Sequence, residues 1–123
     1  MSIRRVVPDI TSDRLEESRD FYTAFLGFDV AMDMGWIVTF VSPTNPTAQI
    51  SVVQASQIPA GHPNAAVTVE VADVDAVHKR ALTRSLEIVY PLTDEPWGVR
   101  RFFVRDPNGV VLNVMSHRER SGQ

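Results

Sequence analysis

The sequence predicts an α+β fold built from two tandem modules, each with the element order β-α-β-β-β. Two observations support this prediction: the same order of five strand and helix patterns occurs twice, and the repeats are offset by roughly 60 residues. The chain has 123 residues, enough for a single domain over 1–123. Strands in such modules twist, so we expect a cupped mixed sheet that surrounds a cleft.

The first module spans about residues 1–56. Residues 3–9 are rich in apolar and β-branched side chains and predict a strand. Residues 13–27 have apolar side chains near helical spacing, and Gly27 predicts the end of that helix. Three further strand patterns follow, over 28–34, 36–42 and 48–54.

A segment rich in proline and glycine, about residues 57–63, predicts a linker. The second module then covers about residues 64–117 and repeats the order of the first. Its helix is predicted over 73–85, starting at an Asp73 cap. Its strands are predicted over 65–71, 86–92, 99–105 and 110–116.

The last two strands form the clearest local pattern, RFFVRDPNGVVLNVMS over 101–116. Asp106, Pro107, Asn108 and Gly109 are turn formers, so this stretch predicts a β-hairpin. Asn113 is an amide within an otherwise apolar strand. This position is a candidate for a hydrogen-bonding role, or for a structural amide paired with neighbouring backbone.

Composition excludes several classes of protein. The chain has no cysteine, which excludes disulfides, thiolate metal sites and a cysteine nucleophile. Its net charge of −3, with no clustered basic stripe, argues against nucleic acid as a partner. No apolar stretch approaches about 18 residues, so neither a membrane span nor a secretory leader is expected, and the expected location is cytoplasmic.

Three motifs together resemble a known family. They are S-x-x-F-Y-x-x-x-L-G-F starting at Ser18, EVADVDA over 70–76, and PWG-x-R-x-F-x-V-R-DPNG over 96–109. This set is similar to the vicinal oxygen chelate superfamily, which includes glyoxalases, bleomycin-resistance proteins and extradiol dioxygenases. The resemblance implies paired βαβββ modules, a homodimer and a cavity. In the family's enzymes, that cavity holds a divalent metal on His and Glu side chains.

The resemblance also implies which positions would carry those ligands. The closing Glu position falls four residues after Gly109, at Asn113, and its counterpart in the first module is Ser51. The two His positions fall on Ala66 and Val7. None of these four side chains is a good ligand for a divalent first-row metal. Asp9 with Glu70 is the weak alternative for an improvised metal site.

We expect the cleft to be lined by these four positions and by further aromatic, basic and apolar side chains. Arg100 is a candidate to bind a ligand carboxylate, with a salt bridge as its alternative role. Asn113 is expected to pair with Ser51 across the cleft. The complete predicted lining is Val7, Trp36, Phe40, Ser51, Ala66, Arg100, Phe102, Asn113 and Met115.

The predicted function is a bleomycin-resistance-type protein that sequesters a small, partly aromatic molecule as a homodimer, with no cofactor and no catalytic residue. One alternative is a metal-dependent lyase, isomerase or dioxygenase that holds one divalent metal on atypical ligands. A dimerisation or regulatory module without a ligand is the other alternative.

Overall fold

The computed structural model describes residues 2–58 and 64–118. It divides the chain into two compact units, here called the N-unit, Val6–Asn64, and the C-unit, Met1–Arg5 with Ala65–Gln123. The first residues of the chain therefore belong with the second half of the sequence. Most of the predicted linker, residues 59–63, lies outside the described residues.

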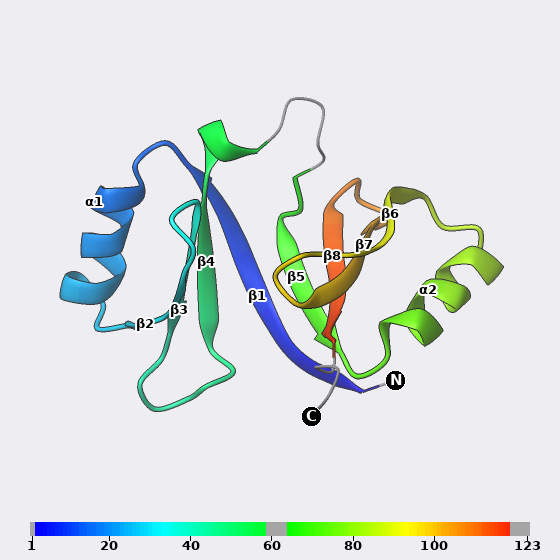
Figure 1. Cartoon of the computed structure of the whole chain (residues 1–123), viewed down its shortest axis with the longest axis horizontal. Helices are drawn as coiled ribbons and strands as arrows, with labels where there is room; N and C mark the ends of the chain where they lie inside the picture. The colour runs from blue at the N-terminus through cyan, green and yellow to red at the C-terminus, as the bar shows by residue number, and fades with distance from the viewer. Residues whose placement is uncertain (1, 59–63, 119–123) are drawn as a thin grey trace. The chain divides into compact units, whose positions relative to one another are not determined.

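The N-unit contains the larger part of β1, three further strands, the helical segment formed by α1 and η1, and one 3-10 turn (Figure 1). β1 pairs in parallel with β4, β4 pairs antiparallel with β3, and β3 pairs antiparallel with β2. The predicted helix is present, but its second half is π-helical and is labelled η1. In chain order the elements are β1 (Ile3–Ser12), α1 (Leu15–Asp20), η1 (Phe21–Phe25), β2 (Asp29–Asp33), β3 (Ile37–Val41), β4 (Gln49–Gln54) and the 3-10 turn η2 (Ala55–Gln57).

The C-unit repeats this order. β5 pairs in parallel with β8, β8 pairs antiparallel with β7, and β7 pairs antiparallel with β6. Asp73 caps α2 as predicted, because its side chain accepts a hydrogen bond from the N–H of Ala76. The elements are β5 (Val67–Val71), α2 (Val74–Thr83), β6 (Ile88–Asp94), β7 (Val99–Arg105) and β8 (Val111–His117).

The hydrogen-bonded strand order is β2-β3-β4-β1-β5-β8-β7-β6, one mixed eight-stranded sheet. This order and the two helices confirm the predicted α+β class with repeated βαβββ modules. Across residues 2–58 and 64–118, no helix has both the length and the apolar character needed to span a bilayer.

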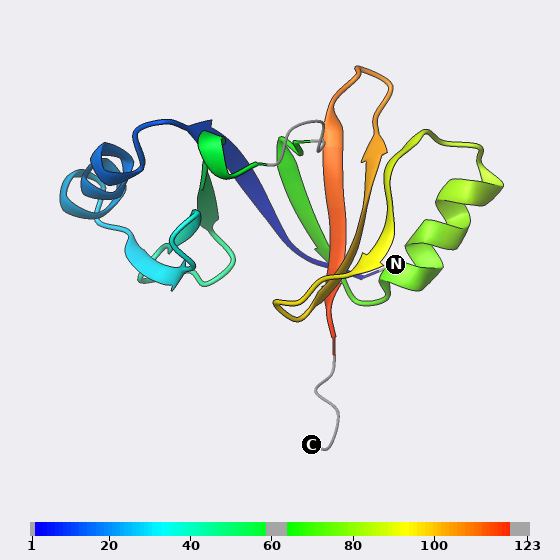
Figure 2. The same cartoon turned by 45° about the horizontal axis from the view of Figure 1, so that its top comes forward.

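In each unit a helix covers one face of the strands and buries the apolar core there. In the N-unit, Phe40 is fully buried beside Val38 and Val52, and its ring stacks on Tyr22 of η1 with centroids 5.2 Å apart. In the C-unit, α2 lies along β7 and β8 (Figure 2). There Phe102 is fully buried, with Val114 as a neighbour on β8.

The turn between β7 and β8 is closed by its own residues. The carboxylate of Asp106 accepts hydrogen bonds from the N–H groups of Asn108 and Val110. The hydrogen bond to Val110, with the others at this turn, holds the pKa of Asp106 below its ordinary value. Gly109 has φ +84°, a conformation that glycine adopts without steric cost. These contacts confirm the predicted hairpin and set its register.

Because Phe102 is fully buried against α2, Phe102→Ala should lower the free energy of unfolding by about 3–5 kcal/mol. Urea denaturation followed by circular dichroism measures this loss. Leu82→Ala on the exposed side of the same helix is the control and should change the value by less than about 0.5 kcal/mol. Equal losses in the two variants would contradict the assignment of this core.

Candidate functional site

Strand alternation divides the C-unit side chains between two faces of the sheet. Phe102 and Val114 face α2, so their neighbours in sequence face the other way. Register places Arg101 opposite Met115, and Phe103 opposite Asn113. The face opposite α2 carries Thr68, Glu70, Arg101, Phe103, Asn113 and Met115.

Arg101 is the centre of an aromatic cluster on this face. Its guanidinium carbon lies 4.8 Å from the ring centroid of Phe103, 5.2 Å from that of Trp97 and 5.3 Å from that of Tyr90. A guanidinium at these distances is attracted by the negative faces of the rings. Trp97 is the exposed ring of this cluster, Tyr90 is half-buried and Phe103 is buried. Because aromatic rings stack on flat ligands, Trp97 provides the accessible aromatic surface.

A buried carboxylate fixes this arginine in place. Arg101 Nε donates to Glu95 Oε2 at 2.6 Å, and the Tyr90 hydroxyl donates to the same oxygen at 3.0 Å. Both charged side chains are largely buried, which strengthens their interaction. Among the described residues, no side chain accepts a hydrogen bond from the terminal nitrogens of Arg101. These nitrogens therefore retain hydrogen-bonding capacity toward a ligand.

Asn113 has an unpaired buried oxygen. Its Nδ2 donates to Thr68 Oγ1 at 3.0 Å. Its Oδ1 is buried and has no hydrogen-bond partner among the described residues. Leaving a buried acceptor unsatisfied costs about 1–3 kcal/mol, so the site holds an acceptor that a ligand N–H or O–H group would satisfy.

Glu70 forms a second polar cluster on this face. Its carboxylate forms an ion pair with the Arg5 guanidinium. A second hydrogen bond joins Glu70 Oε2 to His117 Nδ1 at 3.0 Å. Burial acts to raise the pKa of Glu70, but the hydrogen bonds from His117 and Arg5 outweigh it and lower the pKa below the ordinary value. Glu70 is therefore a charged, paired group that ties the start of β1 to β5 and β8.

In the N-unit the corresponding face carries Ser51 and Thr39, whose hydroxyl oxygens are 2.7 Å apart and buried. Val7 shares strand parity with Asp9, the register partner of Ser51, and only 2% of Val7 is exposed. Each of Asn113 and Ser51 has a partner within its own unit, Thr68 for Asn113 and Thr39 for Ser51. The predicted pairing of Asn113 with Ser51 would join the two units and stays a prediction.

Three predicted lining residues lie on the helix-covered faces. Phe40 and Phe102 are fully buried in the two cores. Arg100 does not face the side that carries Asn113. Its guanidinium binds Asp75 of α2 at 3.0 Å and Asp94 of β6 at 3.1 Å. The hydrogen bonds that Arg100 donates to Asp75 and Asp94 raise the pKa of Arg100, and the two carboxylates neutralise the charge that was expected to bind a ligand.

The remaining predicted residues have mixed positions. Met115 is buried and lies beside Arg101 on the face opposite α2. Ala66 is exposed and precedes β5, and its N–H donates to the carbonyl of Val111. Trp36 is half-buried at the start of β3, where its carbonyl accepts from Gln54 N–H.

The arginine on the Asn113 face is Arg101, one residue from the predicted Arg100. The sequence contained a signal for this, because the turn at Asp106–Gly109 sets which residues of the two strands are opposite each other. Odd-numbered residues before the turn share a face with odd-numbered residues after it. Glu95 carried no such signal, since its burial depends on contacts with Tyr90 and Arg101.

The donor set does not fit a divalent metal. Within residues 2–58 and 64–118, no group of three or more His, Cys, Asp and Glu side chains is placed to hold a metal ion. In the weak alternative pair, Asp9 lies in the N-unit and Glu70 in the C-unit, and the Glu70 carboxylate is already bound by a guanidinium. A bound cation next to this carboxylate opposes the entry of a second cation. His62 lies outside the described residues.

Comparison with known proteins gives a family and a set of folds. The family model of the Glyoxalase/Bleomycin resistance protein/Dioxygenase superfamily matches residues 3–114. No curated protein matches the chain.

Solved structures share the fold at low identity. A superfamily member from Vibrio splendidus 12B01 has a TM-score of 0.70 and 19% identity, covering 94% of this chain and 99% of its own. A hypothetical protein from Bacillus halodurans C-125 has a TM-score of 0.75 and 11% identity, covering all of both chains. A Streptomyces coelicolor methylmalonyl-CoA epimerase, in complex with 2-nitronate-propionyl-CoA, has a TM-score of 0.70 and 16% identity, covering 96% and 100%.

The lowered pKa of Glu70 predicts a pH dependence of stability. A carboxylate whose pKa is lower in the folded state stabilises the fold above its unfolded pKa, and this contribution is lost as the pH falls through the folded value. Glu70→Gln should therefore cost about 1–2 kcal/mol of unfolding free energy at neutral pH, and the difference from wild type should shrink below about pH 4.

Urea denaturation of both proteins between pH 7 and pH 3 measures this difference. Glu17→Gln, which removes an exposed carboxylate from α1, serves as the control and should change the stability little at any pH. A Glu70→Gln deficit that stays constant down to the lowest pH would contradict the charged pairing.

Proposed function

Because the chain belongs to the glyoxalase/bleomycin resistance protein/dioxygenase superfamily, we propose that it is a small-molecule binding protein of the bleomycin-resistance type. It holds a partly aromatic ligand without a protein-bound metal. The observation that carries this proposal is the identity of the four side chains at the family's ligand positions, Val7, Ser51, Ala66 and Asn113. Two are aliphatic, one is a hydroxyl paired with Thr39, and one is an amide.

The aromatic cluster around Arg101 is evidence that the proposed ligand is planar. Tyr90, Trp97 and Phe103 surround a single guanidinium that already has its carboxylate partner. The pair Arg101–Glu95 is neutral as a whole, so the surface favours an uncharged or weakly polar ring over a strongly charged one. The free terminal nitrogens of Arg101 would then donate to a carbonyl or similar acceptor on that ring.

The unpaired Asn113 oxygen supports a ligand that also donates a hydrogen bond. Phe103 lies opposite Asn113 in the register of β7 and β8, and Met115 follows Asn113 on the same face of β8. Both side chains are apolar and buried. An apolar surface with a few polar groups is typical of small-molecule sites. The expected ligand is therefore a planar aromatic molecule that bears both a donor and an acceptor.

The side chains that could donate to a metal give less support to the alternative function, a metal-dependent enzyme. Glu70 has its charge satisfied by Arg5, and Asn113 and Ser51 are neutral oxygen donors. Divalent first-row metals prefer imidazole and free carboxylate ligands. The expected homodimer, small-molecule partner and cytoplasmic location remain predictions carried by the sequence.

Metal content separates the two functions. The untagged protein, incubated with Mn, Fe, Co, Ni or Zn and then desalted, should retain less than about a tenth of an equivalent of any metal per chain. Elemental mass spectrometry measures this directly. Retention of about one equivalent that is lost in Glu70→Gln would refute metal-free binding and support the enzyme alternative.

Binding of naphthalene-2-carboxamide, an uncharged planar probe with an N–H donor, tests the site. Its addition should shift the indole N–H resonance of Trp97 more than that of Trp36. Asn113→Leu should weaken binding about 5–10-fold, the equivalent of one lost hydrogen bond of about 1 kcal/mol. The same variant should keep or raise the free energy of unfolding, because it removes an unpaired buried oxygen.

Gln57→Leu, which removes an exposed amide in the N-unit, is the matched control and should leave binding unchanged. If Asn113→Leu lost much of its unfolding free energy but bound naphthalene-2-carboxamide as tightly as the wild type, Asn113 would be a structural residue. That result would contradict its proposed role in ligand binding.

A further inference from the structure

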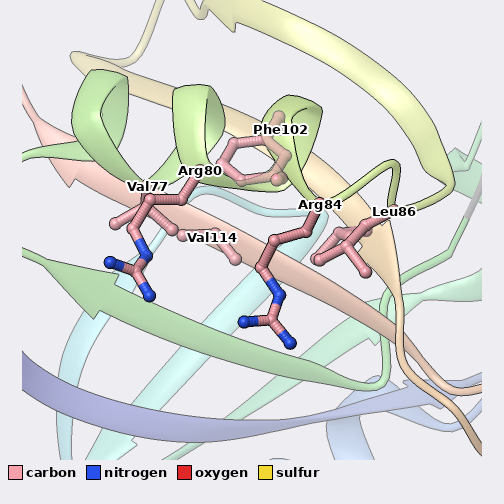
Figure 3. Close-up of a pocket in the computed structure, with 8 residues that line it drawn as sticks. Val77, Arg80, Arg84, Leu86, Phe102 and Val114 are labelled. Atoms are coloured by element: carbon pink, nitrogen blue, oxygen red, sulfur yellow. The ribbon is translucent and has the colours of Figure 1, made fainter.

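A cavity lies on the helix-covered side of the C-unit sheet, between α2 and the strands that it covers (Figure 3). Its volume is about 270 Å³. Its floor is formed by Phe102, Val104 and Val114 of β7 and β8, and its other walls come from α2 and from Leu86 just after it. This cavity is separate from the Asn113 face, because its floor residues belong to the helix-covered side.

The end of α2 fixes one wall of this cavity. Ser85 adopts φ 56°, its N–H donates to the carbonyl of Leu82, and the N–H of Leu86 donates to the carbonyl of Ala81. This pair of hydrogen bonds is the Schellman motif, which turns the chain back against the last helical turn. The backbone therefore holds Leu86 in place beside Ala81.

Two arginines line the same cavity. Arg80 lies in the last turn of α2, and Arg84, four residues later, is the C-cap residue that follows this helix. Figure 3 shows both side chains extending in the same direction. Two like charges at this spacing repel each other unless something neutralises them. Neither guanidinium forms an ion pair with any of the described residues.

Six other arginines of the described chain have carboxylate partners, whereas Arg4 has none among the described residues and Arg118 donates to the backbone carbonyl of Glu95. Arg5, Arg14, Arg19, Arg100, Arg101 and Arg105 each pair with Asp or Glu. Glu87 lies only three residues beyond Arg84, yet it binds Arg105 instead. In a chain with a net charge of −3, two adjacent unpaired arginines beside an apolar cavity form a local positive site.

We propose that this cavity binds a small amphiphilic anion, with its apolar tail against Phe102, Val104 and Val114 and its carboxylate or phosphate head on Arg80 and Arg84. A guanidinium pair is suited to either head group, because each presents a planar fork of N–H donors. The volume is slightly below the range of about 300–1,000 Å³ typical of drug-sized ligands, so a ligand with a short tail fits best. This binding is independent of the function proposed for the Asn113 face.

Octanoate and octyl phosphate are suitable anionic probes. The control compounds are 1-octanol and octylammonium, which have an alkyl tail of the same kind but no negative charge. The isotope-labelled full chain is titrated with each probe, and the methyl resonances of Val77, Val104 and Val114 report occupancy. Octanoate or octyl phosphate should shift these methyls, and the tighter of the two identifies the preferred head group. Both comparison compounds should bind at least about tenfold more weakly, since they lack the negative charge.

Single substitutions locate the head group. Arg84→Gln and Arg80→Gln should each weaken binding of the anionic probe by about fivefold or more. Lys79→Gln removes the same charge from α2 at a residue that does not line the cavity, and it should change binding less than about twofold. Val77→Phe should block the cavity while it keeps both arginines.

Three results would overturn the proposal. The first is the absence of methyl shifts with both anionic probes up to their solubility limits. The second is an equal loss of binding in Lys79→Gln and Arg84→Gln, which would show general charge attraction. The third is loss of octanoate binding in Asn113→Leu, which would place the probe on the opposite face of the sheet. Failure of the carboxamide probe on that face would leave this result unaffected.

Discussion

The register of the β7–β8 hairpin determines which chemistry each face of the C-unit presents. The turn at Asp106–Gly109 fixes this register through side-chain and backbone hydrogen bonds. A slip of β8 by one residue would exchange Asn113 with Val114 between the two faces. A slip of β7 by one residue would move Arg101 into the core and Phe102 out of it. The aromatic cluster, the amide and the apolar core therefore depend together on one turn.

The separation of the two faces has an energetic basis. On the side of α2, side chains such as Phe102 and Val114 are buried by the helix and supply the apolar core. On the other side, charged side chains are held by partners: Arg101 by Glu95, and Glu70 by Arg5 with His117. Pairing lowers the cost of burying these charges. Asn113 Oδ1 is the exception, because it is buried and has no hydrogen-bond partner among the described residues, and the proposed ligand site is placed there for this reason.

Family membership and the local chemistry point in different directions. The superfamily fold is associated with metal-dependent enzymes, but a fold does not by itself imply a function. In this chain the positions at which the resemblance places metal ligands carry side chains with little affinity for a divalent metal. On the C-unit sheet, Asn113 lies opposite Phe103 in register, and the proposed function is direct contact of this face with an organic ligand.

The sequence by itself determined the two repeated modules, the order of their elements, the hairpin turn and the absence of metal ligands at Val7, Ser51, Ala66 and Asn113. These features are local or periodic, so a linear pattern contains them. The turn also signalled that Arg101 shares the face of Asn113, whereas tertiary structure decided the contacts of the two arginines: Arg100 binds Asp75 on α2, and Arg101 lies against Trp97 and Phe103. Tertiary structure also decided that Phe40 and Phe102 are core residues, that Glu95 is buried, and that Arg80 and Arg84 have no carboxylate partner among the described residues. Each of these outcomes depends on side-chain contacts that arise when strands, helix and loop pack together, and the linear pattern does not encode such contacts.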